Sequence, residues 1–322
     1  MKKIGILTSG GDAPGMNAAI YAVFNRAKSN GISVIGIKKG YKGLINDEFF
    51  EMQAADVEGI CKRGGTILKS ARSKRFKTNE GQKLAIKILE SRGIEGLVVI
   101  GGNGSLQGAK ALAEKTDMKI IGVPSSIDND INGCDLSIGF SSACDIVTKS
   151  IDNIKDTAVS FHTDKPRIFA VEAMGRRSGW ISVMAGMAAE ADLIIIPEEN
   201  PSIKCIANNI RNVLSKKNDC VILYAEGISR SDNFIEKLKS ELGYRIRHSL
   251  LGFQQRGGSP TTSDRILALR MGNAAVDKIL EGDSGKFITI QSDKIQVKEL
   301  DNREDLFYYN KYLELFSDKI VK

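Results

Sequence analysis

Short apolar segments alternate with helical patterns along almost the whole chain, and this alternation constrains the fold more than any other feature of the sequence. Strands that alternate with helices form parallel sheets with helices packed on both faces. We therefore expect an α/β protein that binds its ligands at the carboxyl ends of the strands. The predicted strands are Lys3–Leu7, Ser33–Ile37, Leu97–Ile100, Lys119–Val123, Arg167–Val171, Leu193–Ile196, Cys220–Tyr224 and Phe287–Ile290.

Helices are expected where apolar residues recur every three or four positions. A serine followed three residues later by a carboxylate is also a helix-start pattern, and Ser142 with Asp145 resembles it. The predicted helices cover residues 16–30, a segment that begins at Ser142, and residues 263–280.

The composition excludes several classes of protein. No apolar run approaches the ~18 residues of a membrane span, and the first residues lack the apolar region of a signal peptide, so we expect a cytoplasmic protein. Five cysteines without any CxxC spacing argue against zinc sites and disulfide frameworks. The 322 residues leave room for two domains, with a boundary expected near residue 140.

The chain is basic: 46 lysines and arginines against 39 aspartates and glutamates give a net charge of +7. Nucleic-acid binding is disfavoured, because no run of five basic residues occurs and aromatic residues make up only 6%. Two interpretations stay open. The charge belongs to a lysine-rich surface, or arginines gather in space to hold phosphate groups.

Glycine-rich loops follow two of the predicted strands. TSGGDAPG follows the first strand, and GGNGS, residues 101–105, follows the strand that ends at Ile100. Glycines at a strand-to-helix turn let a phosphate approach the backbone N–H groups of the helix start. Either loop alone also fits a tight turn, whereas two on adjacent parallel strands favour a polyphosphate ligand.

Two carboxylates follow a third strand. Asp128 and Asp130 stand in PSSIDND, residues 124–130, directly after a predicted buried strand. Carboxylates near a buried strand are costly unless they bind something. One interpretation is a general base next to a magnesium-linked group, as phosphoryl transfer requires. The alternative is an aspartate that caps a helix.

Arginines beside glycines or strand ends can supply the countercharge for phosphates, although each one alone also fits an ordinary surface residue. They are Arg72, Arg167, Arg176, Arg177, Arg247 and Arg256. His162 and His248 are the only histidines, which disfavours a histidine nucleophile or metal centre.

Seven motifs occur in an order that is specific to one family: LTSGGDAPGMNAAI, RGGTILKSAR, VVIGGNGS, PSSIDNDI, VEAMGR, YAEG and LGFQQRGGSPTTSDR. Over nearly its whole length the chain resembles the bacterial ATP-dependent 6-phosphofructokinases. The resemblance implies a homotetramer whose subunits have two Rossmann-like, three-layer αβα domains with mainly parallel sheets. The implied domains are a nucleotide-binding domain of residues 1–140 and 252–305, and a sugar-phosphate-binding domain of residues 141–251 and 306–322.

The resemblance also implies a reaction, the glycolytic transfer of the γ-phosphoryl of Mg-ATP to the 1-hydroxyl of fructose 6-phosphate. Asp128 matches the carboxylate that takes the proton of this hydroxyl, and Asp130 matches a neighbour linked to the metal through water. Ser126 matches a threonine beside the transferred phosphoryl, and Arg176 matches a residue that stabilises charge in the transition state.

The remaining roles are also carried over from the family. The implied nucleotide positions are Gly11, Arg72, Ser73, Gly102, Asn103, Gly104 and Ser105. Those around the sugar phosphate are Ser126, Ile127, Asp128, Arg167, Met174, Gly175, Arg176, Glu226, Arg247, Phe253 and Arg256. Of these, Arg167 and Arg247 match residues that reach in from a neighbouring subunit.

Three residues depart from the family pattern. Asn103 replaces an aspartate that helps to hold magnesium, Phe253 replaces a histidine that contacts the phosphate of the sugar, and Ser125 replaces a glycine beside the phosphoryl path. Two alternatives therefore stay open. One is a pyrophosphate-dependent enzyme, although such relatives usually have aspartate in place of Gly104 and lysine in place of Ser125. The other is a catalytically weak paralogue that binds sugar phosphate or nucleotide as a regulatory subunit.

The family's effector site also differs here. Bacterial relatives commonly bind ADP or phosphoenolpyruvate through arginines on the first helix and near residue 54. This chain has Tyr21, Asn25 and Ala54 at those places. We expect a weak or absent response to both effectors.

Overall fold

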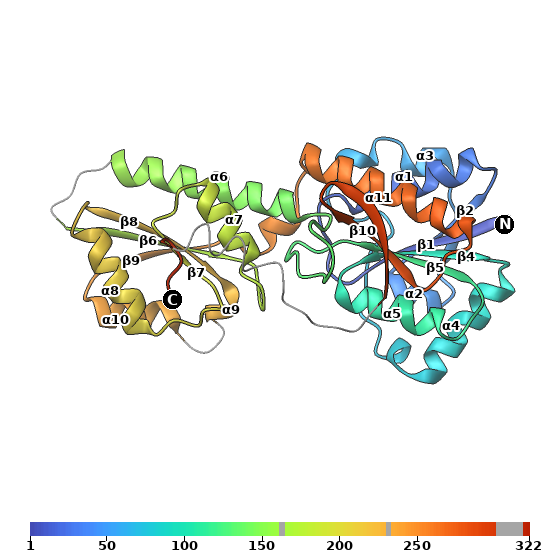
Figure 1. The fold of residues 1–322 in the computed structure, drawn as a ribbon, viewed down its shortest axis with the longest axis horizontal. Coiled ribbons are helices and arrows are strands. Elements are labelled where there is room, and N and C mark those ends of the chain that lie inside the picture. The colour runs from blue at the N-terminus through green and yellow to red at the C-terminus, as the bar shows by residue number, and fades with distance from the viewer. Residues whose placement is uncertain (161–164, 230–232, 301–317) are drawn as a thin grey trace. The chain divides into compact units, whose positions relative to one another are not determined.

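A computed structural model describes residues 1–160, 165–229, 233–300 and 318–322. The chain divides into two compact units. Unit 1 comprises Met1–Ser141 and Arg256–Asp305, and unit 2 comprises Ser142–Gln255 and Leu306–Lys322. Both are built from a mainly parallel sheet with helices on its faces, as the sequence predicts (Figure 1). Among the described residues, no helix is long and apolar enough to cross a membrane.

Unit 1 contains a seven-stranded sheet in the order β11-β10-β5-β4-β1-β2-β3. The five inner strands run parallel, and β3 and β11 are antiparallel to their neighbours. The central strands are almost fully buried, as expected for a sheet covered on both faces. The strands are β1 (Lys3–Ser9), β2 (Ser33–Ile37), β3 (Phe49–Glu51), β4 (Gly96–Gly101), β5 (Lys119–Pro124), β10 (Lys286–Gln291) and β11 (Lys294–Glu299).

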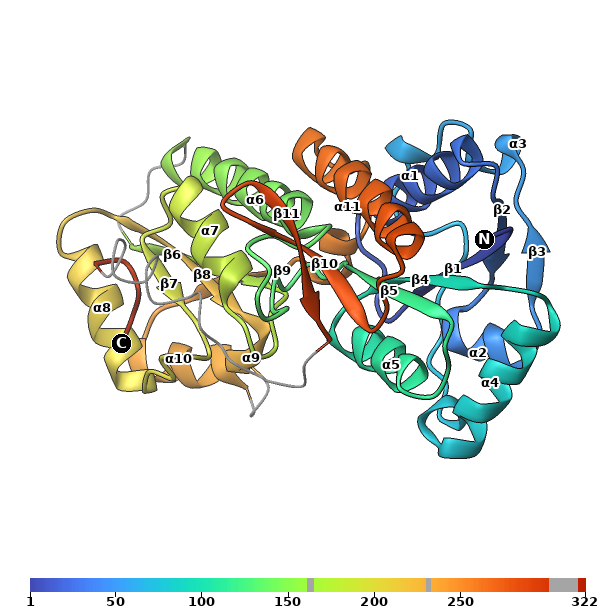
Figure 2. The ribbon, with the colours of Figure 1, turned by 45° about the vertical axis from the view of Figure 1, so that its right-hand side comes forward.

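Helices cover both faces of this sheet, with α1 and α11 on one face and α2, α4 and α5 on the other (Figure 2). Gly272 of α11 allows the close approach of α1, because a Cβ at this position would lie 2.7 Å from Cβ of Ala22. The helices are α1 (Met16–Ser29), α2 (Gly40–Ile45), α3 (Ala54–Val57), α4 (Asn79–Ser91), α5 (Asn103–Ala113) and α11 (Thr262–Glu281), with short 3₁₀ turns η1 (Ile60–Lys62) and η2 (Arg75–Lys77).

Unit 2 contains a four-stranded parallel sheet in the order β7-β8-β6-β9. Residues of α8 and α10 pack on one face and form an apolar core with alternate residues of β6 and β8. The strands are β6 (Arg167–Ala173), β7 (Leu193–Ile195), β8 (Asp219–Ala225) and β9 (Ile246–Leu250). The helices are α6 (Phe140–Ser160), α7 (Trp180–Ala188), α8 (Ile203–Leu214), α9 (Glu226–Ser229) and α10 (Phe234–Leu242), with a 3₁₀ turn η3 (Gly252–Arg256).

All eight predicted strands are present, with boundaries that differ by no more than two residues. The expected start of a helix at Ser142 is wrong. Helix α6 begins at Phe140, directly after Gly139, which has a left-handed φ of 104°. Ser142 therefore lies inside the first turn of the helix. Helix α11, which matches the prediction for residues 263–280, is capped by Thr261, whose Oγ1 accepts a hydrogen bond from the backbone N–H of Asp264.

Candidate functional site

The three loops that the sequence singles out lie together at the carboxyl ends of strands in the sheet of unit 1. They follow β1, β4 and β5, which are direct neighbours in the sheet and run parallel. Their carboxyl ends therefore point the same way, and the loops meet where an α/β sheet binds its ligands. The sequence-based prediction that the two glycine-rich loops follow adjacent strands is confirmed.

The first loop is shaped by glycines. Gly10 has a φ of 89°, a left-handed conformation that favours glycine. A Cβ on Gly10 would lie 3.2 Å from Oγ of Ser105, so this loop and the start of α5 are in close contact. A Cβ on Gly11 would lie 3.1 Å from Nη1 of Arg256. A guanidinium group therefore lies beside the backbone of the first loop.

The second loop opens α5. Gly102 is the N-cap residue, and Asn103 and Gly104 form the exposed first turn. The side-chain amide of Asn103 donates from Nδ2 to the backbone carbonyl of Asp130, at 3.1 Å. Apart from its chain neighbours and the backbone of α5, no atom of the described residues lies within 4 Å of the position of a Cβ on Gly104. The fold therefore gives no packing reason for a glycine at position 104.

The third loop contains the two aspartates. Oγ of Ser126 donates to Oδ1 of Asp130 at 2.9 Å, which joins both ends of the IDND segment. Ile127 is buried, Asp128 is half-buried and Asp130 is exposed. The loop turns outward after Ser125 and leaves both carboxylates within reach of a ligand from solvent.

Arg72 and Ser73 lie on a segment that is tied to the end of β1. Oγ1 of Thr8 donates to the carbonyl of Lys69 at 3.0 Å and lies 2.8 Å from Oγ1 of Thr66. Ser73 accepts from the backbone N–H of Phe76, at 3.2 Å, and Arg72 is exposed. The cation at position 72 is thus held on the same unit as the glycine-rich loops.

In unit 2, the turn after β6 meets the end of β8. Gly175 has a φ of 134°, and its carbonyl accepts from the backbone N–H of Gly227 at 3.0 Å. Nε of Arg176 donates to Oε1 of Glu226 at 3.0 Å, and Arg176 keeps 55% of its side chain exposed. Met174 is buried beside this turn. The sequence motifs VEAMGR and YAEG are therefore brought together.

A second basic group lies on β6 and β9. The guanidinium carbons of Arg167 and Arg247 lie 5.1 and 5.4 Å from the ring centre of Phe169. Burial lowers the pKa of Arg247, and the nearby charges of Arg167 and Arg245 lower it further. Like charges gathered in this way favour an anionic ligand. Arg167 and Arg247 are thus arginines that gather in space, as one of the two interpretations of the basic charge expects.

Arg167 is itself largely buried in unit 2. It is 8% exposed, and Nη1 donates to the carbonyls of Thr157 and Ala158 in the last turn of α6, at 3.0 and 3.2 Å. A cation at the carboxyl end of a helix satisfies carbonyls that lack a partner within the helix. Its part in a neighbouring subunit stays a prediction.

Two further predicted residues lie at the end of the β9 segment. Phe253 is 78% exposed on η3. Arg256 lies against Gly11 of the first loop, within unit 1. Within unit 1, Arg256 therefore lies beside the loop that follows β1, and its part in binding the sugar phosphate stays a prediction.

One polar cluster was missed by the sequence analysis. The hydroxyl of Tyr224 donates to Oε2 of Glu172 and lies 2.7 Å from both this atom and Nε2 of His248. Burial raises the pKa of Tyr224, and the hydrogen bond to Glu172 raises it further. In the sequence, the only sign of this cluster was a polar side chain on each of the strands β6, β8 and β9. His162, the other histidine, lies outside the described residues.

The described residues contain no group of three or more histidine, cysteine, aspartate or glutamate side chains that could hold a metal ion. Oxygen atoms of Asn103, Ser126 and Asp130 do lie at the site edge. Mg²⁺ typically needs only one or two carboxylates when it arrives with phosphates of a substrate. The donor set therefore fits a metal carried by a nucleotide rather than one resident in a protein cage.

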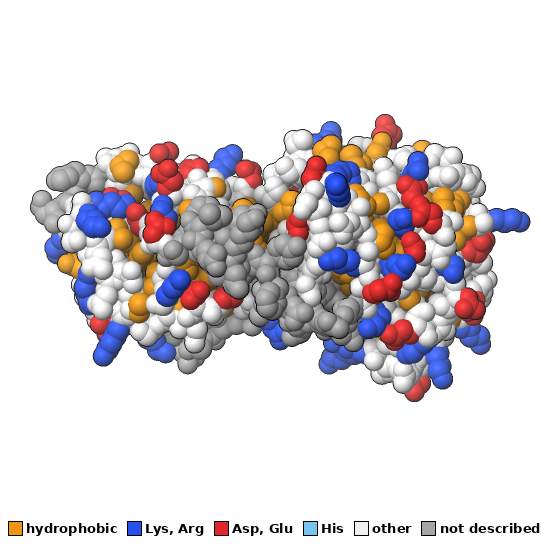
Figure 3. All heavy atoms as spheres, viewed as in Figure 1, with side chains coloured by type: hydrophobic (Ala, Val, Ile, Leu, Met, Phe, Trp, Pro, Cys, Tyr) orange, Lys and Arg blue, Asp and Glu red, His pale blue; other side chains and the backbone are white. Residues whose placement is uncertain are grey.

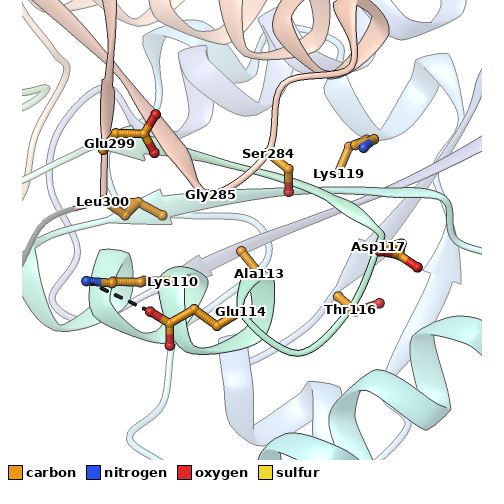
Figure 4. A pocket seen from close by; sticks show the side chains of 10 residues that line it. All are labelled: Lys110, Ala113, Glu114, Thr116, Asp117, Lys119, Ser284, Gly285, Glu299 and Leu300. Atoms are coloured by element: carbon orange, nitrogen blue, oxygen red, sulfur yellow. Dashed lines mark ion pairs between the residues drawn. The ribbon is translucent and has the colours of Figure 1, made fainter.

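A surface pocket lies at the opposite end of the strands, around the last turn of α5 and the start of β5 (Figure 4). Lys110 and Glu114 form an ion pair at 3.9 Å along its wall, and Lys119 and Asp117 also line it. This end holds none of the predicted site residues. On the face drawn in Figure 3, basic and acidic side chains intermingle over both units.

The chain matches known proteins over nearly its full length. The sequence profile of the family described as phosphofructokinase matches residues 3–279. The chain is 45% identical to an ATP-dependent 6-phosphofructokinase of Thermotoga petrophila, over 92% of each chain. It is 46% identical to an ATP-dependent 6-phosphofructokinase of Clostridium tetani, over 98% of this chain and 97% of the relative.

Solved structures agree with this match. A phosphofructokinase of Pichia pastoris in the T-state superposes with a TM-score of 0.85 and 35% identity over 93% of this chain, which spans only 35% of the Pichia chain. A pyrophosphate-dependent phosphofructokinase of Nitrosospira multiformis, at 20% identity, has a TM-score of 0.86 over 96% of this chain and 86% of its own. The second similarity supports the fold alone.

Proposed function

Because the chain belongs to the phosphofructokinase family, we propose that it is an ATP-dependent 6-phosphofructokinase. It transfers the γ-phosphoryl of Mg-ATP to the 1-hydroxyl of fructose 6-phosphate and releases ADP and fructose 1,6-bisphosphate. The observation that carries this proposal is the convergence of three loops, after β1, β4 and β5, at the carboxyl ends of strands in the unit 1 sheet.

The nucleotide binds at the two glycine-rich loops. Backbone N–H groups at Gly11 and at the start of α5 donate hydrogen bonds to the phosphates, and Arg72, Ser73, Gly102 and Ser105 surround them. Position 104 supports ATP as donor, since its open space receives no side chain and is available to the rest of the nucleotide. Glycine in an exposed first turn is otherwise unfavourable by ~1 kcal/mol relative to alanine.

Magnesium enters as part of the Mg-ATP substrate. Asp130 reaches it through water, and Asn103 offers one amide oxygen without a charge. When bound, the metal neutralises charge on the phosphates. The amide of Asn103 keeps the β4–α5 loop joined to the Asp130 loop through its 3.1 Å hydrogen bond.

Asp128 is the general base. The 1-hydroxyl oxygen attacks the γ-phosphorus, the bond from that phosphorus to the bridging oxygen of ADP breaks, and the hydroxyl proton goes to the carboxylate of Asp128. The hydroxyl of Ser126 lies beside the transferred group, and Arg176 stabilises the charge that develops there. Half-burial of Asp128 fits a base that must meet its substrate from solvent.

The sugar phosphate takes its countercharge from unit 2. Arg247 and Arg167 hold the 6-phosphate, and their mutual repulsion in the free protein supports an anion there. Glu226 accepts from sugar hydroxyls, and Phe253 lies against the apolar edge of the sugar. The other contacts are Ile127, Met174, Gly175 and Arg256.

We further propose a homotetramer in the cytoplasm. Leu250, the last residue of β9, is 62% exposed, and Phe253 on η3 is 78% exposed. Both lie close in sequence to Arg247. Exposed apolar residues next to a ligand site favour a protein contact. Analytical ultracentrifugation tests this assembly, and a monomer at micromolar concentration would contradict it.

A steady-state assay of the pure protein tests the function. ATP and pyrophosphate are compared as donors against fructose 6-phosphate and other sugar monophosphates. We expect turnover with ATP and fructose 6-phosphate. Activity with pyrophosphate alone would identify the pyrophosphate-dependent alternative, and binding of ligands without turnover would identify the regulatory one.

A further inference from the structure

Asn129 lies between the two aspartates and has an unusual backbone. Its φ is 48°, in the left-handed region, although it is not a glycine. Asparagine tolerates this region better than most residues, because its short amide can bond to nearby backbone. The side chain of Asn129 does so from a buried position, with the residue only 8% exposed.

Both ends of the Asn129 amide are used. Oδ1 accepts from the backbone N–H of Ser137 at 2.7 Å, and Nδ2 donates to the carbonyl of Asp135 at 3.0 Å. The hydroxyl of Ser137 then donates to the carbonyl of Ser126 at 2.5 Å. These bonds close the loop into a ring, since they join its outgoing part at Ser126 to its returning part at Ser137.

The ring is anchored to the body of unit 1. The backbone N–H of Asp135 donates to the carbonyl of Ile290 at the end of β10, at 3.0 Å. The carboxylate of Asp135 accepts from the backbone N–H of Ser292, at 2.8 Å. Through Asp135, the Asn129 amide therefore ties the segment with the aspartates to strand β10.

We propose that Asn129 is a positioning residue for catalysis, which with Ser137 holds Asp128 and Asp130 in their reactive orientation. This rests on the proposed function, in which Asp128 is the base. The left-handed backbone at Asn129 sets the directions of the two neighbouring carboxylates, and the buried amide bonds keep that conformation. Asn129 itself touches no substrate.

The decisive variant is Asn129→Gly. Glycine adopts the left-handed backbone readily, so this change removes the amide and keeps the conformation accessible. Misplacing a reacting group by about 1 Å can cost about 10²-fold in rate, and we expect a loss of kcat between about 10-fold and that value. The KM values for ATP and fructose 6-phosphate should stay within about threefold, because no binding group is removed.

Two further proteins complete the experiment. Asn200→Gly is the matched control, because Asn200 is also left-handed, with a φ of 42°, and lies outside the proposed site. It should keep the parental kcat. Ser137→Ala removes the hydroxyl, which bonds to the carbonyl of Ser126 and also lies 3.0 Å from Oδ1 of Asn129. It should lower kcat in the same direction as Asn129→Gly, again with KM nearly unchanged.

Hydrogen exchange supplies a readout that does not depend on turnover. The Ser137 amide donates to Asn129, so its exchange should be at least about tenfold faster in Asn129→Gly than in the parent. If the parent shows no phosphofructokinase activity, the proposed function fails and this proposal fails with it. If the parent is active, an Asn129→Gly protein with parental kcat, or with unchanged Ser137 exchange, overturns the positioning role alone.

Discussion

The side chain of Asn103 donates a hydrogen bond to the backbone carbonyl of Asp130, at 3.1 Å. A carbonyl oxygen only accepts, so the facing atom has to be the amide nitrogen. Asparagine in place of the family's aspartate removes a charge from the proposed magnesium site. It also supplies a hydrogen-bond donor that links the second and third loops. An aspartate at position 103 cannot make this bond.

Asn103→Asp should have opposite effects at low and high magnesium. The added carboxylate attracts Mg²⁺, so kcat/KM for ATP should rise when magnesium is limiting. The lost hydrogen bond, worth about 1 kcal/mol, should lower kcat about fivefold at saturating magnesium. A magnesium titration of both proteins measures this. Asn103→Ala, which has neither charge nor donor, should be impaired throughout. An Asn103→Asp protein that is neutral or harmful at every concentration would contradict the proposed role of Asn103 at the metal.

Replacing the proposed base should abolish most turnover. Asp128→Ser should lower kcat by at least ~10²-fold, the low end for a positioned acid–base group, with little change in affinity for sugar phosphate. Steady-state kinetics and a binding titration separate the two effects. Asp117→Ser, an exposed aspartate at the opposite end of the strands, is the control. A kcat within a few-fold of the parent would remove Asp128 from this role.

Gly104→Ala should separate stability from ATP binding. Alanine in the first turn of α5 should raise the free energy of unfolding by roughly 0.5–1 kcal/mol, since the new Cβ meets no described atom within 4 Å beyond its neighbours and the helix backbone. The same methyl group occupies space proposed for ATP, so KM for ATP should increase. Denaturant unfolding and kinetics report the two effects. Gln107→Ala, on an exposed position of the same helix, should leave KM unchanged, and an equal KM in Gly104→Ala would place the nucleotide elsewhere.

The Tyr224 hydroxyl should make stability fall at alkaline pH. Burial and the bond to Glu172 raise its pKa above the usual 10.0, so the unfolded chain loses this proton first. The free energy of unfolding therefore falls as pH rises above 10. Tyr224→Phe should cost about 1–3 kcal/mol near neutral pH, because it leaves Glu172 and His248 without this partner, and should flatten the alkaline decline. An equally steep decline in Tyr224→Phe would assign it to other groups.

The fold could be predicted because the buried strands are apolar runs between helical patterns. The three strands that the sequence analysis missed, β3, β9 and β11, are all edge strands of their sheets. Such strands have one side open to solvent, so in β9 only Ile246 is buried, and the strand carries Arg247 and His248. Strand β7 is also an edge, but it is buried and apolar because Ile320 pairs with Ile194 along it.

The site could be predicted as far as the loops, because parallel neighbouring strands bring their carboxyl ends together. The contacts between loops could not. The bond from Asn103 to Asp130 depends on the path of a loop 27 residues farther along the chain. The hydrogen bond from Arg167 to the last turn of α6 could not be predicted either, because an arginine at the start of a strand fits either a surface or a buried position.

The identity of the product tests the central claim most directly. ATP whose γ-phosphoryl oxygens carry oxygen-18 is incubated with fructose 6-phosphate, magnesium and the pure protein, and the labelled product is assigned by phosphorus NMR. We predict label on the 1-position of fructose 1,6-bisphosphate with one ADP formed per transfer, and none with Asp128→Ser beyond a trace. Label that stays in ATP, or appears only as inorganic phosphate, would contradict the assignment of this chain as an ATP-dependent 6-phosphofructokinase.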